Sequence, residues 1–116
     1  MKWKILPFDR LTRTELYAII SLRAAVFIVE QNCVYQDIDN QDQNAYHIIG
    51  KAKDENICAY ARIIPTKQGY VSIGRVAVHA KERNNGYGKT LMQKAIKFCK
   101  QNIKGIQIKI LLKLNF

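Results

Sequence analysis

The stretch "IGRVAVHAKERNNGYGKTLMQKAIKFC", residues 73–99, contains an apolar run, a glycine-rich turn and an amphipathic run in direct succession. The first run is nearly continuous through Val76 and Val78, which predicts a strand buried on both faces. The last run has helical spacing with one apolar face, formed by Leu91, Ala95, Ile96 and Cys99. The stretch therefore predicts a buried strand that turns directly into a helix packed on its own sheet.

The turn reads "RNNGYG" over residues 83–88, which is the pattern R-x-x-G-x-G. Gly86 and Gly88 let the backbone approach a ligand closely and adopt dihedral angles closed to other residues. The first N–H groups of the following helix lack internal partners and lie at the positive end of its dipole, so they suit a pyrophosphate. The spacing excludes a Walker A loop and the dinucleotide-binding glycine pattern. A turn needed only for tight packing of strand and helix is the alternative.

The rest of the chain predicts a single domain over residues 1–116, of the α+β or mixed α/β class. A first helix is expected to begin with Thr12 and Glu15 at capping-box spacing, and Gly105 is expected to end the second helix. The remaining expected elements are a strand at 2–6, the helix at 12–31, a polar loop at 32–46, a hairpin with strands at 48–49 and 57–64, and a last strand at 106–114. The predicted order is β-α-loop-β-β-β-α-β.

The net charge of +10 is unevenly spread along the chain. Residues 81–116 hold nine Lys or Arg against one acid, Glu82, whereas residues 30–56 hold six of the nine acids. Such asymmetry is typical of a nucleic-acid or membrane surface, or of a site for a polyanionic small molecule. Aromatic residues are not interleaved with the basic ones of the C-terminal third, and no helix-turn-helix or RNA-binding signature is found. A nucleic-acid-binding module is therefore the weakest of these hypotheses.

The three cysteines, Cys33, Cys58 and Cys99, are odd in number and widely separated, which disfavours a disulfide framework or a zinc site. They favour reduced thiols in a cytoplasmic protein, and no metal is expected. The N-terminus has no long apolar region, and no run approaches about 18 apolar residues. Neither a leader peptide nor a membrane span is expected.

Several separated motifs resemble, in the same order, those of the GNAT N-acetyltransferases. The pyrophosphate loop of that superfamily reads [RQ]-x-x-G-x-[GA] between a strand and a helix, as "RNNGYG" does here. The similarity extends to its ElaA-like branch through "LRAAVFIVEQNCVYQDIDNQD" (22–42), "HIIG" (47–50), "AYARI" (59–63) and "IGRVAV" (73–78). Together these motifs cover most of the chain from Leu16 to about Cys99.

The resemblance implies acetyl-CoA as cosubstrate and an amine, on a small molecule or a peptide, as acceptor. The backbone of Val76, Ala77 and Val78 would bind the pantetheine arm as if it were an added strand. The pyrophosphate would contact the loop and the start of the helix, at Arg83, Asn84, Asn85, Gly86, Tyr87, Gly88, Lys89 and Thr90. The implied reaction is direct attack of a primary amine on the thioester.

This chemistry needs a base for the ammonium, and a strand N–H can polarise the thioester carbonyl. Glu30, at the end of the first helix and beside the acceptor-side loop, is one candidate base. His47, which titrates nearer neutral pH, is the other. Each has a structural alternative: Glu30 as a helix-end carboxylate paired with an arginine, and His47 as a hydrogen-bonded residue at a strand edge.

Three carboxylates lie close together in "QDIDNQD", residues 36–42. They could attract a cationic amine, or they could form a solvated acidic loop. Their spacing is not that of an EF-hand. Arg23, Arg62 and Arg75 lie in otherwise apolar contexts, and pairing with these acids would make the network structural.

The resemblance ends at about Gly105, where GNAT domains normally continue past a fifth strand through a helix and two further strands, whereas this sequence stops at "IQIKILLKLNF". All six tyrosines precede that point, so the family's C-terminal tyrosine, which can protonate the departing thiolate, has no counterpart. We expect a fold truncated after its fifth strand, by a shortened or frameshifted gene, and a homodimer formed through the exposed last strand. A CoA-binding chain with weak or no turnover is the alternative to an active enzyme.

Overall fold

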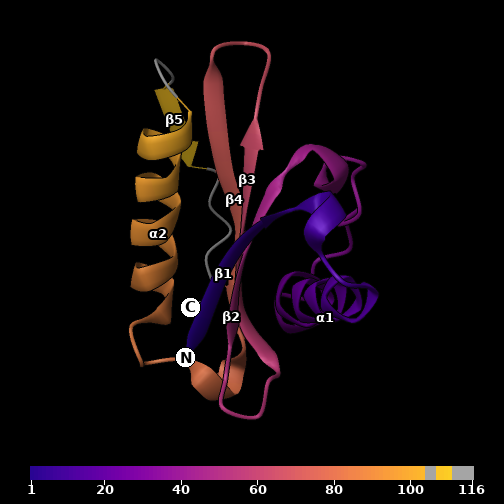
Figure 1. Cartoon of the computed structure of the whole chain (residues 1–116). Helices are drawn as coiled ribbons and strands as arrows, with labels where there is room; N and C mark the ends of the chain where they lie inside the picture. The colour runs from indigo at the N-terminus through magenta and orange to yellow at the C-terminus, as the bar shows by residue number, and fades with distance from the viewer. Residues whose placement is uncertain (104–106, 111–116) are drawn as a thin grey trace.

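The computed structural model describes residues 1–103 and 107–110, which form a five-stranded sheet with one helix on each face (Figure 1). The order of the strands across the sheet follows the chain, and neighbours are antiparallel except that β5 is parallel to β4. The strands are β1 (Lys2–Pro7), β2 (Tyr46–Lys51), β3 (Ile57–Pro65), β4 (Tyr70–Val78) and β5 (Gln107–Ile110). The predicted class and the order β-α-loop-β-β-β-α-β are confirmed.

The first helix, α1 (Arg13–Arg23), begins with the predicted capping box. Thr12 Oγ1 accepts a hydrogen bond from the N–H of Glu15 at 3.0 Å, and Glu15 Oε1 accepts one from the N–H of Thr12 at 2.9 Å. From Ala24 to Glu30 the helix continues with π geometry. The expectation of one uniform helix over 12–31 is therefore wrong in its second half, because apolar spacing over so few turns does not distinguish π turns from α turns. π turns are frequent at functional sites.

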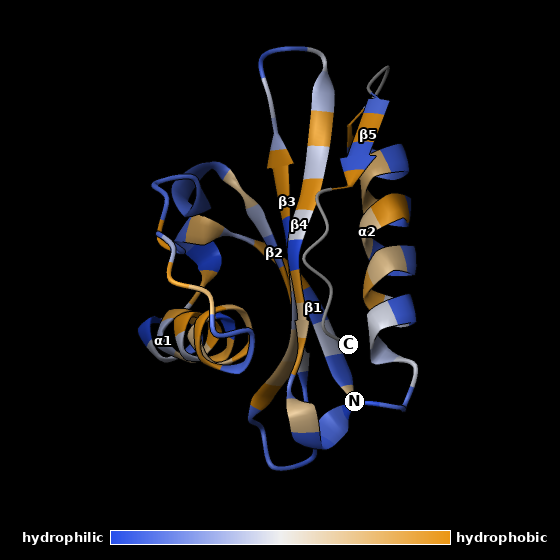
Figure 2. Cartoon of the chain, turned by 180° about the vertical axis from the view of Figure 1, so that it is seen from behind, coloured by the Kyte–Doolittle hydropathy of each residue, from blue (hydrophilic) through white to orange (hydrophobic). Residues whose placement is uncertain are grey.

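The helices cover opposite faces of the sheet, and each closes an apolar cluster. Figure 2 shows the apolar residues on the sheet and on the sheet side of α2 (Tyr87–Asn102), with hydrophilic residues along its outer side. Leu91, Ala95 and Cys99 of α2 are buried in one cluster, and Ile19 and Phe27 belong to the other. Since successive strand residues point to opposite faces, Val76 and Val78 belong to the α2 cluster and Ala77 to the α1 cluster. The predicted burial of β4 on both faces is confirmed.

The end of the chain is described only in part. α2 ends at Asn102, and Gly105 lies outside the described residues, as do 106 and 111–114 of the predicted last strand. Gln107–Ile110 pairs with Tyr70–Ile73 of β4, while the proposed homodimer through this strand stays a prediction. Cys58 and Cys99 are buried, and Cys33 is partly exposed. Across residues 1–103 and 107–110 no helix has the length and apolar character that a membrane span requires.

Candidate functional site

β4 carries a bulge at its middle. The pairing of β3 with β4 shifts register between Tyr60 and Arg62, which lie opposite Ala77 and Gly74. Such bulges bend a strand and increase its local twist. In the part of the chain that the structure describes, β5 pairs only with Tyr70–Ile73, so its pairing ends where the bulge begins. No described strand therefore pairs with the outer edge of β4 beyond the bulge.

The peptide groups of Val76 and Val78 face this outer edge. The N–H of His79 donates to the carbonyl of Cys58 in β3 at 2.7 Å. Every second residue of an antiparallel strand forms hydrogen bonds with the same neighbouring strand, so Ala77, two residues before His79, does so as well. The peptide of Ala77 consequently faces β3. The carbonyl of Val78 accepts a hydrogen bond at 3.1 Å from Arg83 Nε, which is not part of β3. Of the three strand residues predicted to bind pantetheine, the geometry brings Val76 and Val78 to the outer edge and turns the peptide of Ala77 away from it.

The loop after β4 leads into α2 without a side-chain cap. Asn84 and Gly86 both have left-handed backbones, with φ of 68° and 76°. The carbonyl of Gly86 accepts hydrogen bonds from the N–H of Thr90 at 3.0 Å and from its Oγ1 at 3.1 Å, which closes the first turn. Gly86 has no side chain to accept from the first N–H groups of the helix, which belong to Tyr87, Gly88 and Lys89. These N–H groups lie at the positive end of α2 and are suited to an anion.

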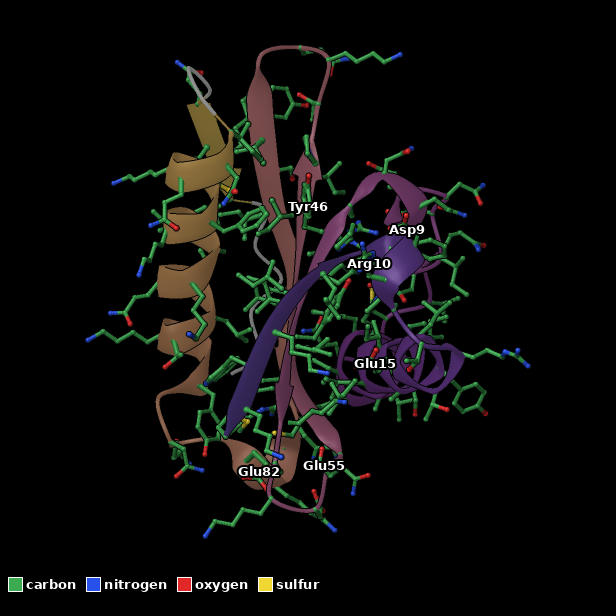
Figure 3. All side chains as sticks on the ribbon, in the orientation of Figure 1. Asp9, Arg10, Glu15, Tyr46, Glu55 and Glu82 are labelled. Carbon is green, nitrogen blue, oxygen red and sulfur yellow. The ribbon has the colours of Figure 1, made fainter. Side chains whose placement is uncertain are left out.

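The other predicted loop residues divide between packing and exposure. The ring of Tyr87 packs edge-on against Trp3 of β1, with centroids 6.1 Å apart, and Gly88 is buried. The side-chain amide of Asn85 donates to the carbonyl of Glu82 at 3.1 Å, and Figure 3 labels Glu82 at the end of the sheet where this loop lies. Lys89 is exposed in the first turn of α2. Lys89 therefore presents a cation to solvent just after the loop.

Arg83 binds Glu30 with both terminal nitrogens. Arg83 Nη2 lies 2.6 Å from Glu30 Oε1, and Nη1 contacts Oε2. The hydrogen bond from Arg83 lowers the pKa of Glu30, which keeps the carboxylate ionised and makes it a weaker base. Of the two interpretations of Glu30, the geometry favours the helix-end carboxylate paired with an arginine.

His47 lies in the interior with no exposed surface. Its Nε2 is 2.9 Å from the carbonyl of Asp42, which can only accept, so this nitrogen is assigned the proton. Its Nδ1 is 2.6 Å from the hydroxyl of Tyr60, which then donates to it. Burial lowers the pKa of His47. The geometry favours the structural interpretation, although β2 lies between β1 and β3 and is not at the sheet edge.

The acidic loop is bound to the sheet and α1 by ion pairs, in what we call the arginine–aspartate cluster, which comprises Arg23, Arg62, Arg75, Asp37, Asp39 and Asp42. Arg23 Nη1 lies 2.7 Å from Asp42 Oδ1, and Arg23 Nε lies 3.0 Å from Asp37 Oδ2. Arg62 Nη2 lies 2.8 Å from Asp39 Oδ2. Three arginines thus face three carboxylates. The pairing interpretation is confirmed, and these carboxylates are not left to attract a cationic amine.

Arg75 pairs with the acids as predicted, and it also has a role at the bulge that the sequence did not indicate. It lies at the bulge of β4 with a left-handed backbone, φ 51°, a conformation that is uncommon outside glycine. Its Nε donates to Asp37 Oδ1 at 2.9 Å and its Nη2 to Asp39 Oδ2 at 3.3 Å. The cluster therefore holds the bulge that opens the outer edge of β4. A charged residue inside an otherwise apolar strand was the available signal.

The chain matches the model of the acetyltransferase (GNAT) family over residues 15–115. This chain belongs to that family. It is 43% identical over 103 residues to the protein ElaA of Escherichia coli, covering 85% of this chain and 67% of ElaA. A UPF0039 protein of Schizosaccharomyces pombe is 45% identical over 94 residues, covering 81% of this chain and 63% of the yeast protein. The chain thus spans about two thirds of the length of these curated relatives.

Two solved structures share the fold closely. The crystal structure of Escherichia coli ElaA superposes with a TM-score of 0.88 at 39% identity, covering 94% of this chain and 76% of that one. An acyl-CoA N-acyltransferase from Pseudomonas aeruginosa also gives 0.88, at 32% identity, covering 94% and 77%. The chain is an ElaA-like member of the GNAT family.

Proposed function

We propose that this chain transfers an acetyl group from acetyl-CoA to a primary amine. The observation that carries the proposal is the outer edge of β4 beside the uncapped N-terminus of α2, in a GNAT fold. The outward peptides of Val76 and Val78 would pair with the amides of pantetheine, as an added strand does. The N–H groups from Tyr87 to Lys89 would bind the pyrophosphate.

The reaction is a direct substitution at the thioester. The amine nitrogen attacks the carbonyl carbon, a C–N bond forms, the C–S bond breaks, and the proton lost by the amine neutralises the departing thiolate. An outward N–H of β4 would stabilise the developing charge on the carbonyl oxygen. Neither Glu30, which is paired, nor His47, which is buried, is placed to take the proton. We therefore infer that the acceptor reacts from its neutral form, so that the rate rises with pH toward the pKa of its ammonium group.

The same observation supports a second candidate function, a chain that binds CoA but turns it over slowly. Its cofactor would bind to backbone groups of β4 and α2, whereas its two candidate bases are paired or buried. The homodimer and the cytoplasmic location stay predictions from the sequence.

Calorimetric titration with CoA and with acetyl-CoA, followed by transfer assays on a panel of small amines and peptide amines, tests both functions. Binding with transfer that accelerates as pH rises is the expected result. Binding without transfer to any amine would favour the second candidate. A chain that binds neither CoA nor acetyl-CoA would overturn both.

A further inference from the structure

The pair formed by Glu30 and Arg83 joins two parts of the chain that are 53 residues apart in sequence. Glu30 is the last residue of the π-helical segment Ala24–Glu30. Arg83 is the first residue of the phosphate loop, by which we mean residues 83–88. Arg83 Nε also donates to the carbonyl of Val78 at 3.1 Å. One guanidinium at the start of the phosphate loop therefore contacts both the end of β4 and the end of the first helical region.

The side chain of Arg83 is poorly placed to bind phosphate. Its Nε donates to Val78, and its Nη1 and Nη2 each donate to Glu30, so three of its five N–H groups are in use. Only 18% of its side chain is exposed, against 35% for Glu30, and the carboxylate neutralises its charge. A guanidinium held in a fork by a carboxylate is fixed in direction as well as in place. The positive potential at the loop comes instead from the α2 N-terminus and the exposed Lys89.

The conformation of the phosphate loop requires contacts from outside the loop to stabilise it. Asn84 adopts a left-handed backbone, with φ of 68°, a conformation that is uncommon outside glycine and is found most often in asparagine and aspartate. Tyr87 packs on Trp3 at the end of the loop, but the hydrogen bonds that the structure gives for residues 84–86 are short-range, such as the one from Asn85 to the carbonyl of Glu82. A loop held in its binding conformation before the ligand arrives loses less conformational entropy on binding.

We propose that Glu30 and Arg83 are positioning residues, whose ion pair fixes the phosphate loop and the outward carbonyl of Val78 in the conformation that receives CoA. The inference rests on the proposed function, in that CoA is the ligand of this loop. Glu30 then acts on cofactor binding and takes no proton from the amine. Arg83 acts through its hold on the backbone and makes no phosphate contact.

The effect of Glu30→Ala on the Kd for CoA decides between the three roles available to this pair. If the pair positions the loop, Glu30→Ala and Arg83→Gln each weaken CoA binding by about tenfold, and the double variant is no weaker than the worse single variant. If Arg83 contacts the pyrophosphate, Glu30→Ala releases the guanidinium and CoA binds equally or more tightly. If Glu30 is the base, Glu30→Ala binds CoA normally while the rate of transfer falls. Either of the last two results overturns the proposal.

Two further variants keep the test specific. Glu30→Gln retains the shape of the side chain without its charge, and it is expected to weaken CoA binding in the same direction as Glu30→Ala. Glu55→Ala removes the carboxylate of another exposed ion pair, formed with Lys2 at 3.0 Å, and is expected to leave the Kd for CoA unchanged. Thermal unfolding of each variant reports whether the chain is folded. Failure of the wild-type chain to bind CoA overturns the proposed function and this inference with it, whereas wild-type binding with an unchanged Glu30→Ala affinity overturns the inference alone.

Discussion

The phosphate loop and the arginine–aspartate cluster both place polar groups beside β4, and they satisfy those groups in opposite ways. At the loop, the N–H groups that begin α2 have no side-chain cap. In the cluster, three carboxylates are paired with three arginines, and among the described residues the only buried side-chain nitrogen or oxygen without a partner is Arg62 Nε. Unpaired backbone donors at a surface favour a ligand, whereas a buried and satisfied ion network favours a fixed conformation. The arginine–aspartate cluster therefore fixes the conformation of β4, whereas the phosphate loop has backbone donors available for a ligand.

Removal of one cluster charge should produce the largest loss of stability. Arg23 is fully buried and contacts both Asp37 and Asp42, so Arg23→Ala takes from each of these buried carboxylates one of its two arginine partners. We expect the free energy of unfolding to fall by about 3–5 kcal/mol, as measured by urea denaturation. Arg75→Ala should cost less, because the side chain of Arg75 is 21% exposed and water can replace it. A loss below about 1 kcal/mol for Arg23→Ala would show that the cluster is not a stabilising unit.

Acid should lower the free energy of unfolding through His47 and, at lower pH, through Asp42 of the arginine–aspartate cluster. Burial lowers the pKa of His47 in the folded chain, so the unfolded chain binds more protons below its own pKa of about 6.5. The contribution of neutral His47 is therefore present above that pH and is lost as pH falls below it, by up to about 1.4 kcal/mol per pH unit. The lowered pKa of Asp42 acts in the same direction, but only toward pH 4 and below.

Urea unfolding at several pH values between neutrality and pH 5 measures this slope. His47→Gln should flatten this slope, and His79→Gln, which replaces the other histidine of the chain, is the matched control. An equal slope in wild type and His47→Gln would assign the pH dependence to other groups.

Two glycines offer a matched comparison between a turn that binds and a turn that does not. Gly86 and Gly69 have similar backbones, with φ of 76° and 84°, and a Cβ at either would meet no atom within 4 Å. Alanine at each should therefore cost about 1 kcal/mol of stability through backbone strain alone. Only Gly86→Ala should also weaken CoA binding, by about tenfold, because Gly69 lies in the β3–β4 hairpin. Equal CoA affinities in Gly86→Ala and Gly69→Ala would show that the backbone conformation at Gly86 does not contribute to CoA binding.

The parts of the fold and of the site that depend on local sequence pattern could be predicted from the sequence. The strand, turn and helix of residues 73–99, the capping box of Thr12 and the pairing of Arg23 with the acidic loop all follow from spacing or residue type. Such features are encoded within a few turns or by an obvious need for a counter-charge.

The rest depends on contacts between distant segments. Nothing in the spacing around Glu30 shows that it meets Arg83, and nothing around His47 shows that Tyr60 and Asp42 enclose it. The bulge at Arg75 is a mismatch between two strands, so it exists only once they pair. Glu30 was a candidate base because of its place beside the acceptor-side loop, and His47 because of its residue type, while partners and burial favour structural roles for both.

Lys89 should give the smallest effect and the sharpest contrast, because its two expected effects have opposite signs. It is exposed in the first turn of α2, where a cation is unfavourable to the helix dipole. Lys89→Gln should therefore leave stability unchanged or raise it by about 0.3–1 kcal/mol, while it weakens CoA binding about two- to fivefold. The loss of affinity should shrink at high salt, since an exposed charge is screened. Calorimetry at low and high salt, with thermal unfolding of the same samples, measures both. A variant that loses stability without losing affinity would show that Lys89 serves the fold, and that the positive end of α2 alone attracts the anion.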